Sequence, residues 1–96
     1  MAWDISTTTQ VLEMVKVDLG IRVTAYDQRL TQYVESAQKA IVREGVKTLS
    51  DDVEDMQLVA MYAGWLWRKR DTGDGMPRNL RWMLNNRIFS EKAGEE

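Results

Sequence analysis

The residues of this chain that could do chemistry are its carboxylates, its hydroxyls and one short glycine-rich stretch. Four acids crowd positions 51–55, but a calcium loop needs a glycine turn and ligands at alternate positions over ~12 residues, and that spacing is absent. The serines and threonines have no histidine or cysteine to activate them, because the chain contains neither. Gly73–Gly75 lacks the preceding strand and the lysine of a phosphate-binding loop. We therefore expect no enzyme activity, no metal and no cofactor.

The elements that carry these residues are predicted to be helices. Apolar residues recur at steps of three and four along four segments, and no segment alternates as a strand does. We expect one all-α domain over residues 1–96, a small bundle of about four helices. The expected helices cover residues 8–19, 25–44, 52–70 and 77–88, and the polar tail 89–96 is expected to fray.

Local signals mark where these helices begin and end. Thr7 with Gln10 predicts a capping box for the first helix, and Thr24 with Asp27 predicts one for the second. Gly20 is expected to stop the first helix. The acids at 51–55 suit the positive N-terminal end of the third helix dipole, and the basic residues at 68–70 suit its negative end.

The third expected helix has an almost unbroken apolar run from Leu58 to Trp67. A helix that is apolar on every side must be covered on every side. Because a chain of 96 residues has few other helices, we expect a partner to cover part of it. The run of ten residues is too short to span a bilayer, and the N-terminus lacks the basic stretch and apolar core of a signal peptide.

Charge is distributed unevenly along the chain. Residues 1–67 contain ten acidic and six basic residues, a net charge of −4, whereas residues 68–87 contain six basic and two acidic residues, a net charge of +4. The basic segment has three open interpretations: solvated cations at a helix end, docking onto an acidic surface of another subunit, or contact with nucleic acid. The basic residues of this segment are Arg68, Lys69, Arg70, Arg78, Arg81 and Arg87.

The tryptophans favour a protein interface. Trp65 and Trp67 project ~200° apart around one helix, so a single core cannot take both unless the helix is surrounded. Trp67 is expected to be a core or boundary residue. Trp82 lies off the apolar stripe of the last helix, and with Arg78 and Arg81 it could form one interface cluster, since tryptophan and arginine are enriched at hot spots. The expected interface residues are therefore Trp65, Trp82 and the six basic residues of positions 68–87.

The order and spacing of several pieces, from about Val11 to Arg87, resemble those of a known family. These pieces are, in chain order, Leu12, Lys16 and Leu19, then Trp67 and Arg68 at the end of an apolar helix, then Pro77, Leu80, Leu84 and Arg87. The layout is similar to that of the small head–tail connector proteins of tailed bacteriophages, which are also called head-completion, adaptor or DNA packaging proteins. Trp67 stands where family members often have a tyrosine.

The resemblance implies a helical protomer that assembles with itself, in about a dozen copies, into a ring beneath the portal protein. Such a ring extends the DNA channel, joins the head to a tail or head-closure protein, and lies close to packaged DNA without specific contact. It implies no cofactor and no membrane partner, and a place at the head–tail junction of a virion made in the bacterial cytoplasm. From the residues themselves, an acidic first part and a basic later segment fit the unlike patches of a heterologous interface.

A second interpretation is a small helical DNA-binding module, such as a phage regulator or packaging subunit. The segment 77–88 is rich in arginine and asparagine and could act as a recognition helix. The net charge of −2 and the apolar residues Trp82, Met83 and Leu84 argue against it.

Overall fold

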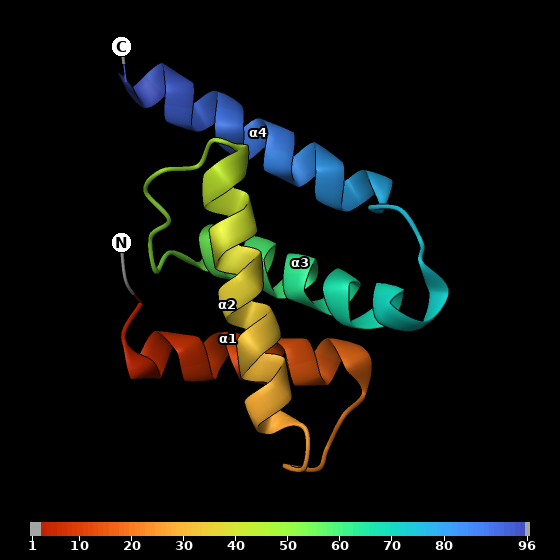
Figure 1. The fold of residues 1–96 in the computed structure, drawn as a ribbon. Coiled ribbons are helices and arrows are strands. Elements are labelled where there is room, and N and C mark those ends of the chain that lie inside the picture. The colour runs from red at the N-terminus through yellow and green to blue at the C-terminus, as the bar shows by residue number, and fades with distance from the viewer. Residues whose placement is uncertain (1–2, 96) are drawn as a thin grey trace.

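The protein folds into four α-helices, and its computed structural model describes residues 3–95 (Figure 1). The helices are α1 (Ile5–Leu19), α2 (Asp27–Glu44), α3 (Val53–Thr72) and α4 (Arg78–Glu95). Residues 3–95 contain no strand, so the predicted all-α class is confirmed. None of these helices is long and apolar enough to cross a membrane.

The first two helices begin at different residues from those predicted. α1 begins at Ile5 because the Asp4 carboxylate, and not Thr7, caps it by accepting the Thr7 backbone N–H at 2.8 Å. Aspartate ranks somewhat above threonine as an N-cap, which agrees with the choice of Asp4. Tyr26 precedes α2 without a side-chain cap, and Asp27 donates its backbone N–H to the Thr24 carbonyl. Both predicted hydroxyl caps are therefore wrong, whereas Gly20 ends α1 in the left-handed conformation, as expected.

The last helix is longer than predicted. α4 continues to Glu95, so the expectation that residues 89–96 fray is wrong for those the structure describes, while Glu96 lies outside them. Contacts with a distant loop explain the extension. Glu91 accepts the Thr48 hydroxyl at 2.9 Å and the Thr48 backbone N–H at 3.2 Å. These bonds tie the second half of α4 to the segment that precedes α3.

The helices form two layers. α3 packs between α1 and α4, and α2 crosses in front of α1 and α3 (Figure 1). The molecule measures 45 × 30 × 18 Å, and its thinnest dimension corresponds to two stacked helices of ~10 Å each. A single helix therefore covers one face of the α1–α3–α4 layer, and no described helix covers the other.

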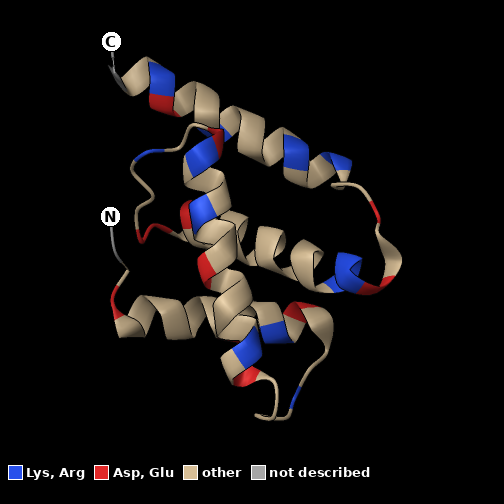
Figure 2. Ribbon diagram, in the orientation of Figure 1, with Lys and Arg blue, Asp and Glu red and all other residues tan. Residues whose placement is uncertain are grey.

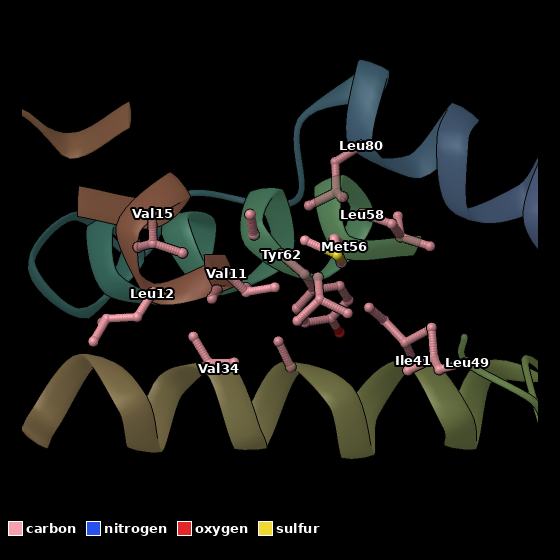
Figure 3. Packing of buried hydrophobic residues seen from close by; sticks show 14 of the residues in the cluster. Val11, Leu12, Val15, Val34, Ile41, Leu49, Met56, Leu58, Tyr62 and Leu80 are labelled. Atoms are coloured by element: carbon pink, nitrogen blue, oxygen red, sulfur yellow. The ribbon is translucent and has the colours of Figure 1, made fainter. Parts of the chain in front are cut away.

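The core lies between α2 and the layer of α1 and α3, and Leu80 joins it from α4 (Figure 3). α3 runs through the middle of the molecule, and three helices of its own chain cover most of its apolar surface. Helices of the same chain therefore bury most of the apolar run of α3, while Met61, Trp65, Leu66 and Trp67 stay partly exposed, so the expectation that a partner covers part of it stays a prediction. The buried apolar side chains of α3 are Met56, Leu58, Val59, Ala60, Tyr62 and Ala63.

A buried ion pair also links the first two helices. Lys16 is almost fully buried, and its Nζ lies 2.8 Å from Asp27 Oδ1. This pair connects the last turn of α1 to the first residue of α2. It gives Lys16, which was singled out in sequence as part of a family pattern, a structural place inside the protomer.

Replacing Gly64 with alanine is expected to raise the free energy of unfolding by about 0.5–1 kcal/mol, because glycine in a helix interior is less favourable than alanine by that amount. Gly64 lies inside α3, and a Cβ there would meet only the Arg68 guanidinium, at 3.6 Å. Gly20 is the control: a Cβ there also finds open space, but its φ of +71° strains an L residue. Gly20→Ala should lower stability by about 1 kcal/mol. Urea denaturation of both variants measures the two changes in the free energy of unfolding. If both changes had the same sign, the prediction would be wrong.

Candidate functional site

The structure brings four of the predicted interface residues to one end of the molecule. Arg68, Lys69 and Arg70 occupy the end of α3, and Arg78 begins α4 after a short loop, so these cations lie at the same end of the two helices (Figure 2). All four are exposed. Only one nearby carboxylate forms an ion pair with them within residues 3–95: Asp71 lies 3.9 Å from Arg70. This pair is solvent-exposed and weak. Asp71 and Asp74 are the two acids of residues 68–78, so the four cations still outnumber the acids at this basic end.

Trp65 and Trp67 pack against residues of their own chain. Trp65 donates its indole N–H to the Asp74 carbonyl at 3.2 Å and meets Tyr62 edge-on, with 5.4 Å between ring centroids. Trp67 meets Tyr26 and Tyr33 edge-on at 5.7 and 5.6 Å. Both tryptophans are half-buried. The structure thus places Trp67 at the boundary of the core, as predicted, and gives Trp65 an intramolecular partner that the sequence did not reveal.

Two of the cations lie over these rings. Lys69 Nζ is 4.6 Å from the centroid of Trp65, and the Arg70 guanidinium carbon is 3.7 Å from the centroid of Trp67. Cations over tryptophan faces are attracted by the ring quadrupole. Arg70 also donates to the Trp67 carbonyl. The basic end is therefore held in place by aromatic rings, and Arg68 and Arg78 are its most independent charges.

The two remaining arginines of the predicted set anchor α4. Arg81 lies 3.5 Å from Glu44 at the end of α2. Arg87 is half-buried and donates through Nε to Asp55 Oδ1 at 2.7 Å and through Nη2 to the Thr48 carbonyl at 3.0 Å. The structure therefore gives both arginines roles inside the protomer, and it does not bring Arg78, Arg81 and Trp82 together as one set of free side chains.

Asp55 sits at the centre of this anchor. Burial raises the pKa of Asp55, but hydrogen bonds from Arg87 and Ser50 outweigh burial and leave the pKa below its ordinary value of 3.8. The pKa of Arg87 is raised, first through its hydrogen bond to Asp55. Hydrogen bonds from Thr48 lower the pKa of Glu91. All three groups are thus ionised at neutral pH, as befits an ionic clamp rather than an acid–base pair.

The outward face of α4 carries two large exposed aromatic residues. Trp82 and Phe89 are 67% and 75% exposed, and their spacing of seven places them on the same side of the helix. Arg78 and Lys92 flank them at the two ends. Trp82 was predicted as an interface residue but Phe89 was not, because the segment from residue 89 onward was expected to fray. The strict seven-residue spacing was the signal that could have found it.

The fold and these surfaces define an all-α protein of four helices with a closed core, a basic end and one exposed aromatic helix face. Among residues 3–95, no three acidic, cysteine or histidine side chains gather as ligands for a metal ion. Comparison with protein-family models, curated proteins and solved structures finds no match to this chain.

Proposed function

We propose that this protein is a structural virion protein, a head–tail connector that forms a ring under the portal of a tailed bacteriophage. In this role it extends the DNA channel and joins the capsid to the tail. The proposal combines the sequence resemblance with one structural observation. The protomer closes its core within a single chain, yet it leaves Trp82 and Phe89 largely exposed on one helix face. Exposed aromatic patches of this kind typically mark protein contacts.

The basic end supports docking onto an acidic surface of a neighbouring copy or of the portal. Arg68 and Arg78 are exposed and form no ion pair with another described residue. A cluster of like charges steers a partner of opposite charge and fixes the orientation of the contact. A structural role, in which the basic end binds another protein, also fits the chemistry of residues 3–95, among which no side chain stands out as a nucleophile or a general base.

Reversing two of these charges is expected to block head–tail joining. In the phage that encodes the chain, Arg68→Glu with Arg78→Glu should yield DNA-filled heads that lack tails, because the basic end then repels an acidic partner. Electron microscopy of lysates, with immunogold labelling of the head–tail junction, measures this. The matched control is Arg22→Glu with Lys39→Glu, two exposed cations elsewhere, which should leave tailed particles unchanged. Complete, infectious particles from a phage that lacks the gene would refute the proposed function.

Exposed Asn85 and Asn86 on α4 favour the second interpretation, a DNA-binding module. Two arginines of the same helix argue against it, because Arg81 and Arg87 already pair with carboxylates of the protomer. Of the α4 arginines, this leaves only Arg78 without an ion pair among the described residues. A gel shift with short duplexes distinguishes the two, since a DNA-binding module should bind with an affinity that falls steeply with salt.

A further inference from the structure

The face of the molecule opposite α2 carries a groove. Its floor is a stripe of α3 formed by Gln57, Met61, Gly64 and Arg68, which are spaced by four, three and four residues and so share one side of the helix. α1 and α4 form the two walls. Because α2 packs on the other side of this layer, no described helix closes the groove.

The groove is continuous along α3. One part lies between Glu54 and Trp82, a second between Val17 and Met83, and a third between Asp18 and Pro77. Neighbouring parts share lining residues, such as Met83 and Met61. From Glu54 to Arg68 the floor spans fourteen positions, or ~21 Å of helix. The groove is therefore long enough to receive about four turns of another helix.

The lining of the groove suits an apolar helix with basic residues. Met14, Met61 and Met83 line its middle, and methionine adapts its shape to a partner. Val17, in the last turn of α1, also lines it, and its side chain is 77% exposed. Absence of a side chain at Gly64 leaves room for a close approach.

The rim of the groove is acidic. Glu13 and Asp18 line it on α1, and Glu54 lines it at the start of α3. None of these three carboxylates forms an ion pair with another residue that the structure describes. Arg68 is the one cation at the far end of the floor. A partner that carries positive charge on either side of an apolar stripe would match this rim.

The outward face of α4 has the complementary chemistry. Its stripe consists of Arg78, Trp82, Asn85, Phe89 and Lys92, with two exposed aromatic residues and one exposed asparagine between two exposed cations. From Arg78 to Lys92 it spans fourteen positions, the same ~21 Å as the floor of the groove. Neither cation forms an ion pair with another described residue.

We propose that the groove of one copy receives the outward face of α4 from a second copy of this chain. Length and apolar character agree between the two surfaces, and the acidic rim is opposite in charge to the two cations of α4. Because the two surfaces differ, the contact is heterologous and repeats from copy to copy, which generates a ring or an open filament. The inference rests on the proposed function and deepens it by assigning both sides of the contact between protomers. Trp82 also lines the Glu54 end of the groove in its own copy, so it contributes to both sides.

Two variants test this contact by mixing. Val17→Arg obstructs the groove, and Phe89→Glu places an acid on the outward face of α4. Both residues are at least three-quarters exposed, so the core is untouched. The wild-type protein should gain mass with concentration in sedimentation velocity, and each variant alone should stay monomeric. The 1:1 mixture should form a heterodimer and nothing larger, because it contains one intact groove and one intact α4 face.

The matched control is Ile5→Arg, which replaces another exposed apolar residue of α1 outside the groove and should assemble like the wild type. Circular dichroism checks that every variant is folded. The inference is overturned if the wild type is monomeric at all concentrations, if either single variant assembles normally, or if the mixture forms no heterodimer. A foreign helix as the true occupant would give the first result. If deletion of the gene gives tailless heads but the mixture forms no heterodimer, the proposed function stands and the proposed contact is wrong. If the mixture forms a heterodimer but deletion leaves normal tailed particles, the contact stands and the proposed function is wrong.

Discussion

Replacing Arg87 with leucine is expected to lower the free energy of unfolding by about 2–3 kcal/mol. The change leaves the Asp55 carboxylate, whose side chain is 4% exposed, without its cationic partner, and breaking a buried pair costs about 3–5 kcal/mol. We take a lower value because Arg87 itself is 21% exposed and Ser50 still donates two hydrogen bonds to Asp55. Against a total stability of about 5–15 kcal/mol for such a domain, the loss should be plain in urea denaturation.

Three further variants assign the effect to the clamp. The free energy of unfolding of Arg87→Lys should lie between those of the wild type and Arg87→Leu. Lysine keeps the charge but lacks the planar guanidinium that reaches Asp55 and Thr48 together. Arg81→Ala is the matched control on the same helix. Its ion pair with Glu44 is largely solvated, so its loss should cost less than about 1 kcal/mol. A larger effect at Arg81 than at Arg87 would contradict the assignment.

The clamp also predicts a pH dependence with a definite sign. The folded-state pKa of Asp55 lies below its ordinary value of 3.8, so the unfolded chain binds this proton more readily. Stability from the pair is therefore complete above pH 3.8 and is lost as the pH falls through the folded-state pKa. The difference between wild type and Arg87→Leu should shrink below pH 3.8, and a constant difference would show that lost packing, not charge, causes the effect.

Truncating Leu84 to alanine is expected to lower the free energy of unfolding by about 2–5 kcal/mol. Leu84 is fully buried where α4 meets the core, and such truncations lose transfer free energy and leave a cavity. Trp82 is the matched control two residues away. Although its side chain is much larger, it is 67% exposed, so Trp82→Ala should change the stability of the monomer by no more than about 0.5 kcal/mol.

The Leu84 and Trp82 variants together separate folding from docking. Thermal denaturation at low protein concentration measures the stability of the monomer, and light scattering at high concentration measures association. Leu84→Ala should affect the first strongly, whereas Trp82→Ala should affect only the second. If Trp82→Ala destabilised the dilute monomer as much as Leu84→Ala does, the outward face of α4 would be part of the core.

Helix type and approximate position followed from periodicity, because apolar stripes at steps of three and four report local geometry. The ends of the helices were harder to predict. α1 had acceptable caps at both Asp4 and Thr7, and the N-cap preferences of the two residue types differ too little to decide between them. The end of α4 depends on Glu91 and Thr48, which are 43 residues apart, and no local signal reveals that contact. For a similar reason, periodicity shows that α3 is apolar on several sides but does not show how many of these sides other helices of the same chain will cover.

The candidate site was predictable in part. Charge counting located the basic end, because Arg68–Arg70 and Arg78 are close in sequence and only a short loop separates their helices. Charge counts could not distinguish arginines that pair within the molecule from those that do not, because Glu44 and Asp55, the partners of Arg81 and Arg87, lie 37 and 32 residues away. The groove could not be predicted at all. It exists because three helices lie side by side with only one face covered, which is a property of the packing and not of any single segment.

The attachment of α4 has a mechanical consequence. Among the described helices α4 packs mainly on α3, and it is held there by Leu80, Leu84 and the Arg87–Asp55 pair. Tension on α4 would reach the other helices through these side chains, through the Arg81–Glu44 and Glu91–Thr48 contacts, and through the loop that joins α3 to α4. Because α4 packs mainly on one helix, whereas α1 and α2 each pack on two, we expect tension to detach α4 before the other helices, and acid to weaken its Arg87–Asp55 pair.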